Sequence, residues 1–114
     1  MPKDSFGFLF RPMFYVYILY SPKADRFYIG YSENVLKRLE EHNNPIGNKY
    51  TAIHKPWSIS VFFPVSVNRG EAMKVEKFIK KQKSRNFINL LIKHKDNKDF
   101  FAKLCDDILN RSVG

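Results

Sequence analysis

The sequence has a single cysteine, relatively few acidic residues and no long hydrophobic stretch. Because Cys105 has no second cysteine to pair with, an intrachain disulfide is excluded and a buried, inert thiol is expected. No apolar run approaches the roughly 20 residues that a membrane helix needs, so no membrane partner is expected. The apolar stretch from Phe6 to Phe10 is cut short by Arg11-Pro12 and lacks a small-residue cleavage site. We therefore expect no signal peptide and a cytoplasmic location.

Cations clearly outnumber carboxylates. The 114 residues include 20 Lys and Arg against 11 Asp and Glu, a formal net charge of +9 at pH 7. This excess favours an anionic partner, nucleic acid above all. The sequence has no zinc-ligand spacing, P-loop or recognition-helix motif, so sequence-specific readout is not expected. A hydrophobic share of 44%, with 11 Phe and 6 Tyr, is enough to build the core of one domain and argues against intrinsic disorder.

Strands are indicated by three runs that are rich in β-branched and aromatic residues. Turn residues at 22–25 join the first two runs, which predicts a hairpin. Pro64 places the third run at a sheet edge or a bulge, because proline cannot donate a ladder hydrogen bond. The expected strands cover residues 14–20, 26–31 and 58–67.

Helices are indicated by apolar residues at helical spacing and by capping residues. Ser32 is expected to cap a helix that runs to about His42, with Glu33 in its first turn. Asn68, with Glu71 in a capping box, is expected to cap another that runs to about residue 83. Two shorter helices are expected at residues 86–93 and 99–110, and a loop at residues 43–56. This order predicts an α+β fold, a small three-stranded antiparallel sheet flanked by helices.

Three polar side chains fall on or beside the inward faces of the two middle helices. At 100° per residue, His42 lies within the apolar stripe of the first helix and Arg38 borders it. Glu76 lies on the inward face of the second, where a carboxylate needs a cation or a metal to stay charged. The alternative for Glu76 is an ordinary ion pair with Lys80 one turn later. Taken alone, His42 is more commonly a hydrogen-bonded, half-buried histidine, and Arg38 a solvated helix residue.

The predicted hairpin adds two tyrosines to these polar residues. Tyr17 and Tyr28 share one face if the strands pair with Leu19 opposite Tyr28. Gly30 removes a side chain where another backbone or a ligand can approach. The alternative is an aromatic hairpin core, which is the interpretation for Tyr15 and the other aromatic residues nearby.

Together these residues resemble the GIY-YIG nuclease domain. Tyr15-Val16-Tyr17 stands at the first triplet, with Tyr15 in place of its glycine, and Tyr28-Ile29-Gly30 matches the second in full. Arg38 and His42 follow at the spacing of the family's helix signature, and the helix around Glu76 is similar to the one that carries its metal-binding glutamate. The closest likeness is to small, free-standing bacterial members.

The resemblance covers about residues 14–92 and divides the chain. Residues 1–13 are expected to form an N-terminal extension, residues 14–92 a GIY-YIG nuclease-like domain, and residues 93–114 a C-terminal helical extension. Tyr31 stands where several repair nucleases of the family carry a lysine that assists the base.

The resemblance implies metal-dependent endonuclease chemistry, in which phosphodiester bonds in DNA are hydrolysed with structural or weak selectivity. Glu76 would hold Mg²⁺ or Mn²⁺ against the scissile phosphate. Arg38 would offset the extra negative charge of the transition state. Tyr17 or Tyr28 would position or deprotonate the attacking water, and His42 would relay that proton or hold a tyrosine hydroxyl. DNA repair is one setting for such an activity.

Basic residues of the later helices and of the loop are expected to follow a phosphate backbone, the alternative being a solvated helix face. The expected nucleic-acid contacts are Lys49, Lys74, Lys80, Lys83 and Arg85. Asn86 is preferred over Asn89 as the equivalent of the asparagine that the family places after its glutamate helix, although either residue also suits a helix cap.

Three functional classes compete. A nuclease acting on DNA rather than RNA leads, and a nucleic-acid-binding module of the same fold that no longer cuts is the alternative. A small protein-interaction domain is the third class. A protein partner or a homodimer is also considered, since a domain this small needs a means of targeting. Metal-dependent cleavage that is lost in Glu76→Ala separates the enzyme from the binding module.

Overall fold

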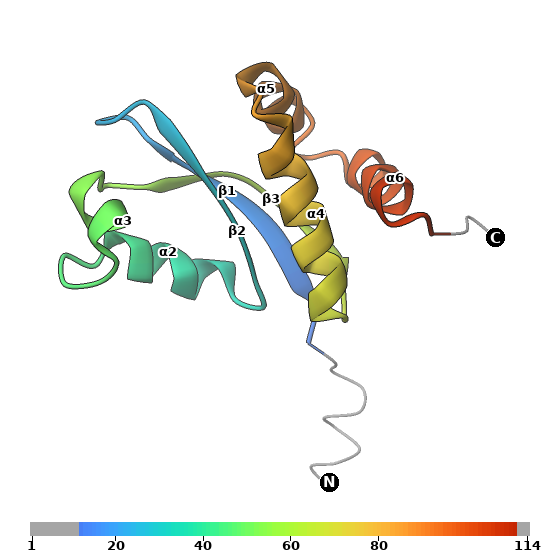
Figure 1. Ribbon diagram of the computed structural model, residues 1–114, viewed down its shortest axis with the longest axis horizontal. Helices are drawn as coiled ribbons and strands as arrows, with labels where there is room; N and C mark the ends of the chain where they lie inside the picture. The colour runs from blue at the N-terminus through green and yellow to red at the C-terminus, as the bar shows by residue number, and fades with distance from the viewer. Residues whose placement is uncertain (1–11, 112–114) are drawn as a thin grey trace, which may run out of the picture.

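The computed structural model describes residues 12–111, so nearly all of the expected N-terminal extension lies outside the described residues. A three-stranded antiparallel sheet, in the order β2-β1-β3, lies between two groups of helices (Figure 1). The predicted α+β class is confirmed. The elements are β1 Phe14–Ser21, β2 Arg26–Ser32, α2 Val35–Asn43, α3 Lys49–Ile53, β3 Ser58–Ser66, α4 Arg69–Gln82, α5 Arg85–Lys93 and α6 Lys98–Leu109.

The central strand β1 contributes to two cores, because successive side chains of a strand point to opposite faces. Val16 and Ile18 pack into the larger core with buried residues of α4, α5 and α6. Tyr17 and Leu19 pack into a smaller core on the side of α2 and α3. All four side chains are fully buried, so the continuous hydrophobic run of β1 reflects burial on both faces.

Helix α6, in the segment expected to be a C-terminal extension, packs on the larger core. The Phe101 ring stacks on Phe63 of β3 with 4.4 Å between ring centroids. Cys105 is fully buried in the same core, and burial raises the pKa of its thiol to about 11. The expected burial of Cys105 is confirmed. Among the described residues, no helix has the length and apolar character needed to cross a membrane.

The expected start of the first helix is wrong. Ser32 is the last residue of β2, where pairing with Tyr15 of β1 keeps it extended. The cap is Asn34, whose side-chain oxygen accepts the Lys37 N–H at 3.0 Å, and Glu33 precedes the helix. The ladder to β1 therefore competes with capping at Ser32 and delays the helix by two residues.

The segment expected as a continuous loop contains the short helix α3. The Asn48 side chain caps it by accepting the N–H groups of Tyr50 and Thr51. The indole N–H of Trp57 donates to the Thr51 carbonyl at 2.8 Å, and the Asn43 side chain bonds both the N–H and the carbonyl of Trp57. The helix is thus tied to α2 through Trp57, a tertiary contact that local sequence patterns do not reveal.

Other local predictions hold. Asn68 caps α4, and Pro64 lies in β3, an edge strand. The capping box is altered, because the Glu71 carboxylate accepts the hydroxyl of Ser66, and that hydroxyl oxygen in turn accepts the Asn68 N–H. The carboxylate thus reaches the cap through Ser66.

The pairing of β1 with β2 places a glycine beneath a tyrosine ring. Leu19 pairs with Tyr28 and Tyr17 with Gly30, as the hairpin pattern predicts. A Cβ atom on Gly30 would lie 2.5 Å from Tyr17 Oη and 2.6 Å from Cζ. Gly30 is therefore required by the Tyr17 ring, which takes the space that a side chain would need.

We predict that Gly30→Ala lowers the free energy of unfolding by roughly 1–3 kcal/mol, the usual cost of overpacking a filled core. Urea unfolding at pH 7 measures this change. In a Tyr17→Leu background the end of the ring is gone, so the same substitution should cost clearly less. Equal costs in the two backgrounds would contradict the assigned contact.

Candidate active site

A cleft of about 540 Å³ opens between β2, the start of α2 and the face of α4. Three of the predicted catalytic residues line it, Tyr28 from β2, Arg38 from α2 and Glu76 from α4. The two helices lie on opposite sides of the sheet, and β2 runs between them (Figure 1). The fold thus brings together side chains from three separate parts of the sequence at one edge of the sheet.

The other two predicted catalytic residues form a pair behind this cleft. Tyr17 Oη lies 3.1 Å from His42 Nε2, a buried hydrogen bond that connects β1 to α2. Only 5% of His42 is exposed, so its predicted place in the apolar stripe is confirmed. The Tyr28 ring lies beside the imidazole, with 4.4 Å between centroids. Tyr28 therefore joins the buried pair to the open cleft.

Burial keeps this pair uncharged near neutral pH. Burial raises the pKa of the Tyr17 hydroxyl, and the Arg38 guanidinium opposes that rise. Burial lowers the pKa of His42, and the same guanidinium lowers it further. A neutral imidazole has one unprotonated nitrogen, so His42 is able to accept a proton.

Arg38 is the guanidinium of the cleft. It pairs with Glu41 at 3.0 Å, and 44% of its side chain remains exposed. The neighbouring Tyr17 hydroxyl and Glu41 carboxylate both favour its charged form and raise its pKa further. Arg38 therefore lies at the border of the apolar stripe of α2 with nearly half of its side chain exposed. It presents a permanent positive charge to the cleft.

Glu76 is both an inward-facing carboxylate and the ion-pair partner of Lys80, the two interpretations that its sequence position allows. Its side chain is only 13% exposed, yet it pairs with Lys80 at 3.2 Å. Within residues 12–111, no three His, Cys, Asp or Glu side chains gather in a cluster able to hold a metal. Mg²⁺ is often held by one carboxylate, with water and substrate oxygens completing its shell. The Glu76 carboxylate fits this mode of binding.

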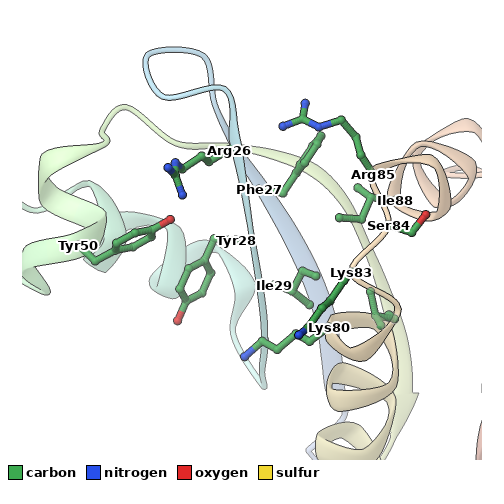
Figure 2. A pocket seen from close by; sticks show the side chains of 11 residues that line it. Arg26, Phe27, Tyr28, Ile29, Tyr50, Lys80, Lys83, Ser84, Arg85 and Ile88 are labelled. Atoms are coloured by element: carbon green, nitrogen blue, oxygen red, sulfur yellow. The ribbon is translucent and has the colours of Figure 1, made fainter.

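The predicted nucleic-acid contacts separate into two groups. Lys80, Lys83 and Arg85 line a groove of about 400 Å³ next to the cleft, and Tyr28 lines both (Figure 2). Arg85 already donates to the Asp25 carboxylate at 3.0 Å and to its carbonyl at 2.7 Å.

The remaining predicted contacts lie elsewhere. Lys49 is an exposed residue in the first turn of α3, and Lys74 is exposed on α4; neither lines the cleft or the groove. Asn86 is exposed in the first turn of α5, whose cap is Ser84, and it also lies outside both. The structure does not bring Lys49, Lys74 or Asn86 to the candidate site.

Two cations that line the cleft, Lys37 and Arg69, are not predicted from the sequence. The Arg69 guanidinium lies over the rings of Phe14 and Tyr31, 4.8 and 5.8 Å from their centroids, and 3.9 Å from a Glu33 oxygen. Arg69 opens α4, where the local pattern marks it only as the residue after a cap. Its place in the cleft depends on the start of β1, and no local signal in the sequence indicates that contact.

A model of the GIY-YIG catalytic domain matches residues 13–89, which is most of the chain. The chain belongs to the GIY-YIG family. This is a nuclease family, so a nuclease-type function and a nucleic-acid substrate follow from membership. GIY-YIG nucleases generally depend on a divalent metal.

Similar proteins come from bacteria. A UPF0213 protein of Clostridium perfringens is 42% identical over 69 residues, covering 60% of this chain and 72% of that protein. A second, from Pediococcus acidilactici, is 35% identical over 80 residues, covering 68% and 80%. A third, from Limosilactobacillus reuteri, is 30% identical over 83 residues, covering 71% and 84%. No solved structure matches this GIY-YIG chain.

We predict that His42 titrates below the usual histidine value of about 6.5, and that Arg38→Gln raises its pKa toward that value. A histidine whose pKa falls on folding stabilises the protein above the unfolded pKa, and this contribution is lost as pH falls through the folded one. NMR titration of the imidazole signals measures both pKa values. A His42 pKa above 6.5, or one that Arg38→Gln lowers, would contradict the assigned electrostatics.

Proposed function

We propose that this GIY-YIG protein is a metal-dependent endonuclease that hydrolyses phosphodiester bonds in DNA with structural or weak selectivity. One observation supports this most directly. Glu76, Arg38 and Tyr28 line one cleft, and the hydrogen-bonded Tyr17 and His42 lie directly behind it. The cleft therefore offers a ligand for a cation, a donor for a phosphate and a route for a proton.

The charged residues act on the phosphate. Arg38 donates charge-assisted hydrogen bonds to its oxygens and offsets the negative charge that grows in the transition state. Glu76 would hold Mg²⁺ or Mn²⁺, which would supply charge neutralisation at the phosphate and stabilisation of the leaving oxygen. Lys80, whose ammonium lies 3.2 Å from Glu76 and whose side chain is half exposed, would have to leave that carboxylate for the cation to bind.

The uncharged residues act on the water. Tyr28, whose ring lines the cleft, positions the attacking water. The Tyr17 hydroxyl lies close enough to Arg38 and Glu76 for both charges to affect its pKa, and it is bonded to His42. A proton taken up at Tyr17 or passed through it reaches the neutral imidazole of His42, which serves as the acceptor.

We predict that Glu76→Gln lowers metal-dependent cleavage by roughly three orders of magnitude, because loss of cation binding removes several kcal/mol of transition-state stabilisation. The measurement is cleavage of labelled duplex, single-stranded, flap and junction DNA with Mg²⁺, with Mn²⁺ and with EDTA. Binding to DNA in EDTA should survive the substitution, since a negative charge is removed.

Glu40→Gln is the matched control, an exposed carboxylate of α2 that does not line the cleft. It should leave cleavage unchanged. If the unmodified protein binds every DNA with steep salt dependence and cuts none of them in either metal, the alternative of an inactive binding module replaces the enzyme.

We further predict that Arg69→Gln weakens DNA binding in EDTA several-fold and lowers the steepness of its salt dependence by about one phosphate contact. The reason is that Arg69 faces the cleft from a platform of two rings, positioned for a phosphate beside the scissile one. Lys103→Gln, an exposed substitution on α6, is the control. Equal salt slopes for both variants would remove Arg69 from the interface.

A further inference from the structure

The groove beside the cleft is not used by the proposed chemistry. It is formed by β2, α3 and the connection from α4 to α5, and four basic residues line it, whereas no acidic residue of the described range 12–111 does (Figure 2). Tyr28 stands between groove and cleft and lines both. A chain that continues from the cleft into the groove therefore meets a lining of basic and aromatic side chains.

Two of the four cations are available for a ligand. Arg85 is held by Asp25 and Lys80 by Glu76. Arg26 and Lys83 form no salt bridge with any residue in the range 12–111. Since charged groups at a groove attract a partner of opposite sign, these two side chains favour an anionic group such as a phosphate.

The groove also has an exposed aromatic wall. Tyr50 of α3 is 43% exposed. His54 meets its ring edge-on at 4.8 Å between centroids, and Trp57 lies 6.5 Å away. The backbone of α3 is itself tied down by the bond from Trp57 to Thr51. The Tyr50 ring is therefore held in place by its aromatic neighbours and by the anchored backbone of α3. Figure 2 shows it beside Arg26 on the side of α3.

We propose that this groove binds one unpaired nucleotide of the substrate strand, adjacent to the scissile phosphate. Its base stacks on Tyr50 and its phosphate contacts Arg26 beside that ring, whereas Lys83, on the opposite side of the groove, contacts a neighbouring phosphate of the same strand. A volume of about 400 Å³ is near the lower end of small-ligand pockets and suits a single nucleotide. Stacking on an aromatic side chain is the usual means of holding an unpaired base.

The proposal rests on the proposed function, since it takes the neighbouring phosphate to lie in the cleft. It narrows the substrate to DNA that is single-stranded, frayed or unpaired beside the cut. A base within an intact duplex is stacked between its neighbours and cannot present its face to Tyr50 without being flipped out. Affinity for single strands should therefore depend on this ring, and affinity for duplex should not.

The test measures binding of fluorescein-labelled DNA in EDTA, so that cleavage does not interfere. Tyr50→Ala should weaken binding of a single-stranded oligonucleotide roughly 5- to 150-fold, the range expected from about 1–3 kcal/mol per stacked base. Tyr50→Phe should bind like the unmodified protein, because the ring is kept. Phe62→Ala, which removes a similarly exposed ring of β3 outside the groove, should also have no effect.

A second arm removes the base in place of the ring. Single abasic positions are moved along the oligonucleotide, and each is measured with the unmodified protein and with Tyr50→Ala. At one position the two losses should not add, because base and ring form the same contact. Arg26→Gln and Lys83→Gln should each lower the salt dependence, which tests the groove without altering Tyr50.

The outcomes separate the two proposals. Selective loss of single-strand affinity with one non-additive position supports the groove. If the protein cleaves DNA with a metal and Tyr50→Ala still binds single strands normally, the proposed nucleotide site in the groove is wrong. The proposed nuclease function then stands. Equal losses for duplex and single strand also overturn the nucleotide site, since the ring then supports the surface in general. Absence of any DNA binding removes both proposals.

Discussion

The contact between the Tyr17 ring and Gly30 is the constraint on which the site depends. It fixes the register of β1 against β2 by steric fit, since any side chain at residue 30 would meet the ring. With this register, the Tyr17 hydroxyl reaches His42 and the Tyr28 ring packs on the imidazole. A shift by one residue would turn every side chain of β2 to the opposite face of the sheet and separate Tyr28 from Tyr17 and His42. Gly30 of the Tyr28-Ile29-Gly30 triplet therefore has a structural role in this chain.

Exchangeable ion pairs are the second organising feature of the cleft. Arg38 pairs with Glu41, Lys80 with Glu76 and Arg69 with Glu33. Both partners are about half exposed in the Arg38–Glu41 and Arg69–Glu33 pairs, and such pairs contribute only about 0–1 kcal/mol because water screens them. A phosphate can replace the carboxylate in these two pairs at little cost, whereas the mostly buried Glu76 needs another cation in place of Lys80. The side chains of the cleft are thus held in position by the fold, whereas their ion pairs can be exchanged for contacts with a ligand.

Sequence reasoning predicts the parts of this molecule that are set by local rules. The strands indicated by β-branched and aromatic runs, the cap at Asn68 and the inward position of His42 all follow from local composition, spacing and side-chain chemistry. The start of α2 and the helix within residues 43–56 do not, because tertiary contacts decide them. Ser32 is held extended by its pairing with β1, and α3 is held by a hydrogen bond from Trp57.

The same division applies to the site. Tyr28, Arg38 and Glu76 meet in one cleft because motif spacing reflects the fold that the family shares. Arg69 is not singled out from the sequence, because its position over the rings of Phe14 and Tyr31 depends on strands that are distant in sequence. Arg85 shows the opposite case, a basic residue whose guanidinium serves the Asp25 turn. Position within a basic segment therefore does not tell which cations are available to a substrate.

Positive charge and selectivity have different physical sources in this protein. A net charge of +9 attracts any nucleic acid, and the strength of that attraction falls steeply with salt. Selectivity requires groups that distinguish one local geometry from another. In the proposed complex, the arginines and lysines act on phosphates that every strand carries, whereas Tyr50 can act only on a base whose face is open. Under this proposal, charge attracts the strand and one aromatic ring distinguishes an unpaired base beside the scissile phosphate, so that a small domain selects substrate structure without reading sequence.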